Sequence, residues 1–308
     1  MLDLQGHRGA RGLWPENTLA GFAHTIELGV SAMELDCAVT RDGVVVVTHD
    51  PHLNPDCTRD ARGRFLESAG PAIYALTYAQ LQTYDVGRLR PESAYAARFP
   101  QQQPMDGERI PRLADVLTLV RARGGARVRV AIEVKTFPEQ PELTPAPEPF
   151  VQAVRLDVER TRASALIAVL AFDWRVLSVA RQLMPQIGTV ALTEQQPDED
   201  TVRLGSPTPS PWLGGLDPAD YGGSIARLVK ATGAGTWGPN YLDLDASRVE
   251  QAHALGLRVV PYTVNEPSDM EQMLAINVDG MISDRPDVLR ALLERRGMPV
   301  PARPGEHP

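Results

Sequence analysis

Short apolar segments alternate with helix-forming segments along most of this 308-residue chain, and that alternation limits its fold more than any other feature. We expect strands at 2–6, 31–39, 127–135, 166–172, 187–192, 235–239, 257–264 and 280–283. The helices expected between them lie within 15–29, 111–123, 150–162, 174–183, 219–231, 247–255, 268–275 and 286–296. Eight such units favour a closed (β/α)8 TIM barrel of the α/β class. An open doubly wound sheet is the alternative, but no G-x-G-x-x-G sequence follows a strand.

The segment 51–110 interrupts this alternation. It is polar, with Gly and Pro at intervals and one short expected helix at 78–84, and it is too long for a plain connection. We therefore expect a small inserted subdomain after the second strand, within one domain of residues 1–296. Two proline-rich connections, 137–149 and 205–218, follow strands and would lie on the barrel rim, as stiff loops or as a lid. Residues 297–308 are expected to form a disordered tail.

The composition excludes several partner classes. The net charge is −8, the pI is near 5.3, and no Lys/Arg-rich run is present, so nucleic acid is not an expected partner. No stretch is long enough to span a membrane. The apolar start at Leu2 has no basic residues before it and no cleavage site after it, so we expect a cytoplasmic protein without a signal peptide. A signal removed earlier would instead place it in the periplasm or outside the cell. The sequence leaves the oligomeric state open.

Ionisable side chains lie where the first strands end. They are His7, the pair Glu34 and Asp36, His49 after an extended run at 44–48, and Glu133. In a barrel these strand ends converge on one pocket. Because residues i and i+2 of a strand share a face, Glu34 and Asp36 project together, as do Glu133 and Lys135. Neighbouring carboxylates repel each other unless a cation lies between them.

This arrangement predicts a metal-assisted reaction on a phosphate. Glu34, Asp36 and Glu133 form an oxygen site suited to one divalent cation, Mg²⁺ or Ca²⁺, with Mn²⁺ as a further candidate. Arg8 and Lys135 add positive charge that suits a phosphate group. His7 and His49 are candidates for a general acid and base.

Each of these residues also has an ordinary structural explanation. A strand-end carboxylate is most often a helix cap or a surface ion pair. On that reasoning Glu16 is expected to pair with Arg8, and Asp284 to cap the last helix. The coincidence of so many groups at three neighbouring strand ends is what favours an active site.

The same residues resemble a known family, the glycerophosphodiester phosphodiesterases. The resemblance is carried by His7-Arg8-Gly9, Pro15-Glu16-Asn17-Thr18, Glu34-Leu35-Asp36, Thr40-Arg41-Asp42-Gly43 and His49-Asp50. It continues through Asp85-Val86-Gly87, Ile110-Pro111-Arg112-Leu113, Ile132-Glu133-Val134-Lys135, Tyr262-Thr263-Val264-Asn265 and Asp284-Arg285-Pro286. It extends from about residue 4 to residue 290 and is most specific in the first fifty residues.

The resemblance implies a TIM barrel that hydrolyses glycerophosphodiesters to glycerol 3-phosphate and an alcohol with a divalent metal ion. By position, Glu34, Asp36 and Glu133 would bind the metal, and His7 and His49 would be the catalytic pair. Arg8 and Lys135 match phosphate-contacting positions. Family members often carry Trp where this chain has Tyr262, so Trp237 is a candidate to supply an apolar pocket wall with it.

Two other functions stay open at this point. One is a phospholipase-like barrel acting on intact lipids, although 51–110 has few consecutive apolar residues to receive acyl chains. The other is a barrel that binds phosphodiesters without turning them over, although binding alone needs no pair of histidines. The nucleophile, water or the glycerol 2-hydroxyl, is also open.

Overall fold

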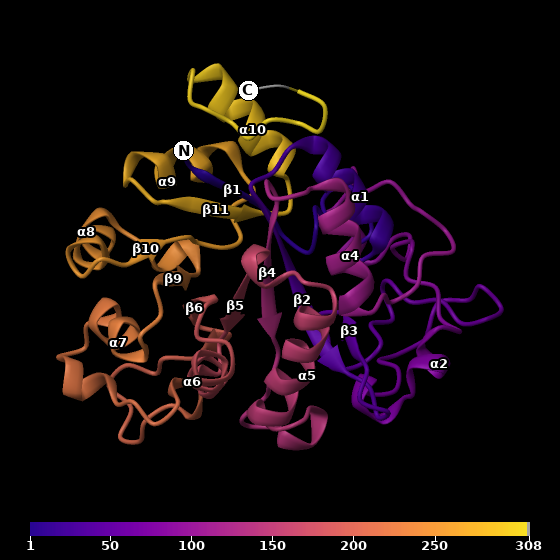
Figure 1. Cartoon of the computed structure of the whole chain (residues 1–308), viewed down its shortest axis with the longest axis horizontal. Helices are drawn as coiled ribbons and strands as arrows, with labels where there is room; N and C mark the ends of the chain where they lie inside the picture. Colours follow the sequence, from indigo (N-terminus) through magenta and orange to yellow (C-terminus); the bar gives the residue numbers. More distant parts are fainter. Residues whose placement is uncertain (307–308) are drawn as a thin grey trace.

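Eight parallel strands form a barrel in the computed structural model, which describes residues 1–306 (Figure 1). The strands are β1 (Asp3–Gly6), β2 (Ala32–Val39), β4 (Arg129–Val134), β5 (Ile167–Ala171), β6 (Gly188–Thr193), β9 (Thr236–Pro239), β10 (Arg258–Val259) and β11 (Gly280–Ser283). They pair in chain order, with β1 between β2 and β11. The predicted TIM barrel is confirmed.

The barrel is nearly closed at the seam between β10 and β11. The strand expected at 257–264 is regular only over Arg258–Val259, since Pro261 has no backbone N–H to donate. Backbone hydrogen bonds still cross the seam: the Val259 carbonyl accepts from Asp279 N–H at 2.8 Å, and the Pro261 carbonyl accepts from Ile282 N–H at 2.9 Å. These hydrogen bonds hold β10 and β11 side by side, so the carboxyl ends of both strands lie at the same end of the barrel.

Helices cover the outside of the barrel. They are α1 (Leu19–Leu28), α4 (Leu113–Arg123), α5 (Pro147–Arg160), α6 (Trp174–Leu183), α7 (Ile225–Thr232), α8 (Ala246–Ala254), α9 (Pro267–Ala275) and α10 (Pro286–Arg295). Thr18 caps α1 by accepting from Gly21 N–H, and Gly29 ends it with a φ of +83°.

Two helix boundaries differ from the prediction. Helix α5 begins at Pro147, inside the connection expected at 137–149, because proline is well suited to the first turn of a helix. The helix expected at 219–231 is interrupted by Gly222 and Gly223, which both have positive φ. A short 3₁₀ turn (Pro218–Tyr221) precedes that break, and α7 follows it.

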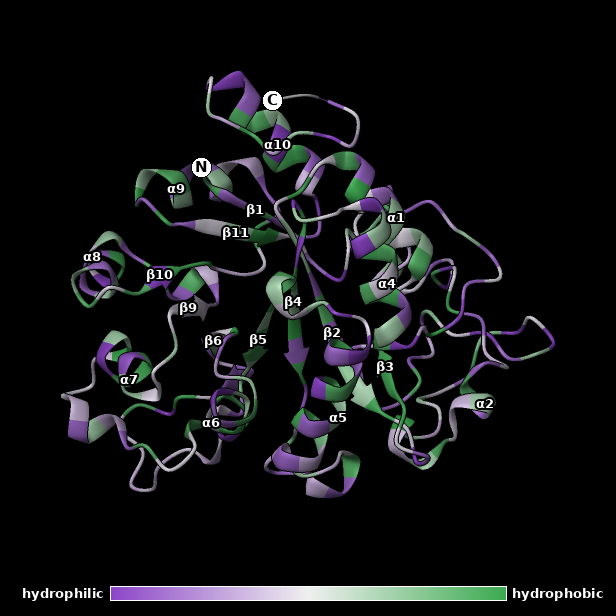
Figure 2. Cartoon of the chain, in the orientation of Figure 1, coloured by the Kyte–Doolittle hydropathy of each residue, from purple (hydrophilic) through white to green (hydrophobic). Residues whose placement is uncertain are grey.

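The barrel has a large outer core and a small inner one. The outer core lies between strands and helices, and the apolar faces of the helices turn toward the strands (Figure 2). The inner core fills the barrel with Ala131, Leu170, Leu192, Val260 and Ile282. Because these residues fill the barrel axis, the cavity at the carboxyl ends of the strands is closed off below by the inner core.

The segment 51–110 packs around a small core that also includes Ala38 and Val46, and its description as an inserted subdomain stays a prediction. That core contains Leu53, Ile73, Leu81 and Ile110 and rests on β3 (Val45–Val47), which pairs antiparallel with β2. The helix expected at 78–84 is a single turn, α2 (Tyr78–Leu81). A second helix, α3 (Ala94–Arg98), was not predicted.

The C-terminal segment expected to be disordered, 297–308, falls partly outside the described residues, at 307–308. Within the described part, Met298 and Val300 pack against the outer core, and Arg290 donates to the Pro301 carbonyl at 2.7 Å. Residues 298–301 therefore belong to the packed structure. Within residues 1–306, no helix is both long and apolar enough to cross a membrane.

Candidate active site

The carboxyl ends of the strands surround a cavity of about 520 Å³. Most of the predicted site residues line it: His7, Arg8, Glu34, His49, Glu133, Lys135 and Tyr262. Asp36 lies beneath its floor and is 1% exposed. The inserted segment also contributes to the cavity wall, through Tyr95 and Arg98.

Strand alternation and register build the carboxylate cluster. Glu34 and Asp36 point into the barrel from β2, and Leu35 between them joins the outer core. Asp36 is the register partner of Glu133 on β4. One carboxylate oxygen from each of Glu34, Asp36 and Glu133 lies within 4.8 Å of the others. The structure thus brings the three predicted metal ligands together.

The electrostatics of this cluster fit a bound cation. Burial and the charges of Asp36 and Glu133 raise the pKa of Glu34 well above its usual range. Asp36 Oδ1 is buried and has no hydrogen-bond partner, although Lys135 Nζ lies 3.3 Å away. Oxygen donors of this kind, buried and incompletely satisfied, are the ligand type that Mg²⁺ and Ca²⁺ prefer.

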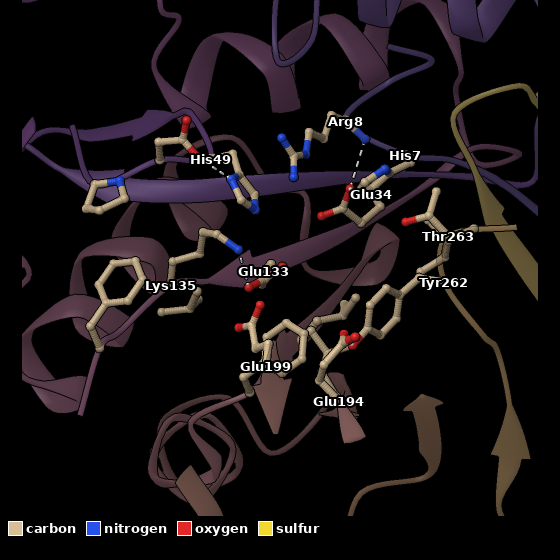
Figure 3. A pocket seen from close by; sticks show the side chains of 18 of the residues that line it. His7, Arg8, Glu34, His49, Glu133, Lys135, Glu194, Glu199, Tyr262 and Thr263 are labelled. Atoms are coloured by element: carbon tan, nitrogen blue, oxygen red, sulfur yellow. Dashed lines mark hydrogen bonds and ion pairs between the residues drawn. The ribbon is translucent and has the colours of Figure 1, made fainter. Parts of the chain in front are cut away.

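His7 is held by a carboxylate from the far end of the chain. Its Nδ1 lies 2.6 Å from Asp284 Oδ1. Its Nε2 lies 3.8 Å from Glu34 Oε2, and these two side chains lie close together in Figure 3. Asp284 also accepts from Arg11 Nε at 2.6 Å and from Asn265 Nδ2 at 2.7 Å. A buried carboxylate among such donors only accepts, so Nδ1 of His7 carries the proton and Nε2 faces the carboxylate cluster.

His49 repeats this arrangement on another side of the cavity. Its Nδ1 lies 2.6 Å from Asp50 Oδ1, and Asn54 Nδ2 donates to the other Asp50 oxygen at 2.7 Å. Burial and the positive charges of Arg8 and Lys135 lower the pKa of His49 to about 4. Burial and Arg11 likewise lower the pKa of His7 to about 4, against the opposing effect of Asp284. Both imidazoles are therefore neutral at pH 7 before an anion binds.

Two basic side chains contact the carboxylates of the cluster. Arg8 Nη1 donates to Glu16 at 2.9 Å, as expected, and its Nε lies 3.4 Å from Asp36. Lys135 Nζ donates to Glu133 at 2.6 Å. Burial lowers the pKa of Lys135, but the charges of Glu133 and Asp36 outweigh that effect and raise it overall. Both cations thus stay charged in the cavity.

Two of the sequence predictions are wrong. Trp237 does not line the cavity: it is 1% exposed in the outer core, and its Nε1 donates to Thr193 at 2.8 Å. The alternation of β9 turns Trp237 outward and its neighbour Gly238 inward. Asp284 is not the cap of α10, a position held by Arg285.

The sequence reasoning also missed supporting residues. Asp284 directly follows β11, the same strand-end position as His7 after β1, and that placement was a signal for its role. Arg11 gave no comparable signal, and Asn17 stood out only as part of the Pro15-Glu16-Asn17-Thr18 motif. Asn17 Nδ2 donates to Asp36 at 2.9 Å from a backbone with a φ of +55°, a conformation that asparagine tolerates better than most residues.

Comparisons with known proteins agree with this geometry. The model of the Glycerophosphoryl diester phosphodiesterase family matches residues 7–288. A crystal structure from Silicibacter pomeroyi DSS-3, assigned as a glycerophosphoryl diester phosphodiesterase, is 35% identical with a TM-score of 0.86 and covers 97% of this chain and 95% of its own. A glycerophosphodiester phosphodiesterase of Bacillus altitudinis is 26% identical over 93% of this chain and 96% of its own.

A more distant solved structure shares the fold. It is a phosphodiesterase of Oleispira antarctica in complex with the product sn-glycerol-3-phosphate, 20% identical with a TM-score of 0.69, covering 94% of this chain and 96% of its own. The family model spans nearly the whole barrel, from the first histidine of the site to the start of α10. This chain therefore belongs to the glycerophosphoryl diester phosphodiesterase family.

Proposed function

We propose that the protein hydrolyses glycerophosphodiesters to glycerol 3-phosphate and an alcohol, in a reaction that depends on a divalent cation. The observation that carries this proposal is the pair of carboxylate-held histidines, His7 and His49, beside a cluster of three carboxylates in one cavity. The product bound to the Oleispira antarctica relative is consistent with it.

Glu34, Asp36 and Glu133 would hold the cation, Mg²⁺ or Ca²⁺, with Mn²⁺ as a further candidate. When bound, such an ion offsets the negative charge that develops on a phosphate oxygen during attack. Arg8 and Lys135 add two fixed positive charges beside the phosphate. Glu16 orients the Arg8 guanidinium. The Arg8 side chain therefore loses little conformational freedom when substrate binds.

The two histidines divide the proton transfers. One accepts the proton of the nucleophile, either water or the glycerol 2-hydroxyl, and the other donates a proton to the leaving alkoxide. A phosphodiester anion between them raises the pKa of both rings from about 4, because a nearby negative charge favours the imidazolium. Both imidazoles are therefore neutral in the unbound site. Bound substrate then raises the pKa of the histidine that acts as general acid toward the working pH.

The first experiment measures release of glycerol 3-phosphate from glycerophosphocholine in EDTA and after Mg²⁺, Ca²⁺ or Mn²⁺ is restored. We expect no release in EDTA and recovery with at least one ion. Release that EDTA does not affect would contradict the metal dependence. No release from any glycerophosphodiester would overturn the proposal, and liposomes would then test for action on intact lipids.

Replacing Glu34 by glutamine is expected to stabilise the metal-free protein at pH 8 by roughly 1–3 kcal/mol. Because the folded pKa of Glu34 is raised, the folded protein binds an extra proton relative to the unfolded chain, and stability falls as the pH rises from about 4.5 through that folded value. Glutamine has no proton to lose, so the variant does not lose stability as the pH rises through this range. The measurement is the thermal midpoint against pH in EDTA.

The same variant is expected to lose most of the rise in thermal midpoint that the restored metal ion gives the wild type, since a ligand is missing. Glu250→Gln is the matched control, because Glu250 is exposed on α8 and far from the cluster in sequence. An unchanged metal-induced shift in Glu34→Gln would contradict the assignment of Glu34 as a ligand.

A further inference from the structure

One wall of the cavity is acidic and aromatic, and the catalytic groups do not use it. Glu194 and Glu199 lie across the cavity from His7, Arg8 and His49 (Figure 3). Phe172, Trp212 and Tyr262 line the cavity with them. This wall comes from the segments after β5, β6 and β10, whereas the catalytic groups come from β1, β2, β4 and the loop after β3.

Glu194 is held in place at the end of β6. Tyr262 Oη donates to its Oε2 at 2.7 Å, and Asn240 Nδ2 donates to its Oε1 at 2.6 Å. Tyr262 thus fixes an acidic side chain in the wall. Phe172 packs edge-to-face on Tyr262, with ring centroids 5.8 Å apart.

Glu199 lies on a small hairpin, β7 (Gln195–Gln196) and β8 (Glu199–Asp200), that follows β6 directly. Asp243 anchors the hairpin by accepting from Gln195 N–H at 3.0 Å and from Gln196 Nε2 at 2.6 Å. Within residues 1–306, neither Glu194 nor Glu199 forms a salt bridge with a basic side chain. Two carboxylates therefore face the cavity without a protein counter-ion.

Trp212 is positioned by contacts between the two proline-rich connections. Its Nε1 donates to Glu139 Oε2 at 3.3 Å, and Arg203 Nη2 donates to Glu139 Oε1 at 2.7 Å. These contacts place an indole at the cavity wall beside the acidic residues. Aromatic rings together with carboxylates form the usual surroundings of a bound ammonium group.

The opposite wall carries basic side chains beside the carboxylates of the proposed metal site. Arg8, Arg11, Arg98 and Lys135 line the cavity there. A substrate phosphate is drawn to that side, and a positive group on the same substrate is repelled from it. The cavity thus orients a zwitterion, with the phosphate at the basic wall and the cation at the acidic one.

We infer that Glu194, Glu199, Phe172, Trp212 and Tyr262 form a subsite for a positively charged leaving alcohol, so that the protein prefers glycerophosphodiesters of amino alcohols, such as choline and ethanolamine, over those of neutral polyols. This preference rests on the proposed hydrolysis and names its substrate class. Glu199 supplies the free charge, and Trp212 supplies a face for the ammonium group.

The test compares kcat/KM for glycerophosphocholine with kcat/KM for glycerophosphoglycerol, whose head group is neutral. We expect wild type to favour the choline ester, and Glu199→Gln to lower the ratio about 5- to 10-fold, the usual size of one ammonium contact. Trp212→Ala is expected to lower the ratio similarly, and Trp212→Phe to retain most of it.

Asp198→Asn is the matched control, because it removes one charge from the same hairpin at an exposed position that does not line the cavity. It is expected to leave the ratio unchanged. An equal fall for both substrates in Glu199→Gln, or an equal ratio change in Asp198→Asn, would overturn the subsite. Wild type that hydrolyses neither substrate would instead refute the proposed function, so the two failures are distinguishable.

Discussion

Alanine in place of His7 or of His49 is expected to lower kcat by about 10²- to 10⁴-fold, the usual loss when a general acid or base is removed. The barrel should stay folded in both variants, because each imidazole borders a cavity and its removal only enlarges existing space. In His7→Ala, Asp284 keeps its bonds from Arg11 and Asn265. The measurement is steady-state release of glycerol 3-phosphate at saturating metal ion.

His52→Ala is the matched control for these variants. His52 lies three residues after His49 and does not line the cavity, and its backbone bridges to Ala72 in the inserted segment. Its turnover is expected to stay close to wild type. Near-normal kcat in His7→Ala or His49→Ala would remove that histidine from the mechanism.

Asparagine in place of Asp284 is expected to lower kcat by roughly 10²- to 10³-fold without changing KM as much. The carboxylate fixes the proton of His7 on Nδ1, and an amide has one acceptor oxygen to share among His7, Arg11 and Asn265. His7 then loses its orientation and its preferred tautomer. Asp284 is thus a positioning residue that acts through His7.

Two readouts separate that role from a merely structural one. The charge of Asp284 raises the pKa of His7, so its removal should shift the acidic limb of the kcat/KM profile to lower pH. The double variant His7→Ala/Asp284→Asn should be no slower than His7→Ala alone, since the two residues act as one unit. Additive losses would contradict the assignment.

Asp157→Asn is a control for the loss of a buried aspartate. Asp157 is 7% exposed on α5, outside the cavity, and its burial raises its pKa. Its replacement is expected to change stability and to leave kcat and the pH profile as in wild type.

Local pattern was enough to place much of the site. The period of two along a strand put Glu34 with Asp36, and Glu133 with Lys135, on the inner face of the barrel. Since parallel strands end at one edge, the same reasoning brought His7 and His49 to these carboxylates. The helix expected within 15–29 is α1, which Thr18 caps and Gly29 ends.

Local sequence pattern did not predict which aromatic side chains line the cavity. Of the two tryptophans concerned, Trp237 lies on a very short strand, and Trp212 lies in the connection 205–218. The four residues of β9 carry no clear alternation, so the sequence did not show that Trp237 points outward. Trp212 reached the cavity instead, from a connection whose path is set by Glu139 and by the turns around it. Loop conformation depends on such distant contacts, and a loop sequence has no hydrophobic periodicity from which its path could be predicted.

The sequence by itself determined the barrel and the inward faces of β2 and β4, because hydrophobic periodicity follows directly from backbone geometry. Only the tertiary structure decided that Asp284 orients His7, 277 positions away, and that Tyr262 holds Glu194. The contact between Asp284 and His7 forms when the barrel closes and brings its first strand beside its last, and the contact between Tyr262 and Glu194 forms when β6, β9 and β10 assemble side by side. Closure depends on the packing of all eight strands at once, and no single segment encodes it.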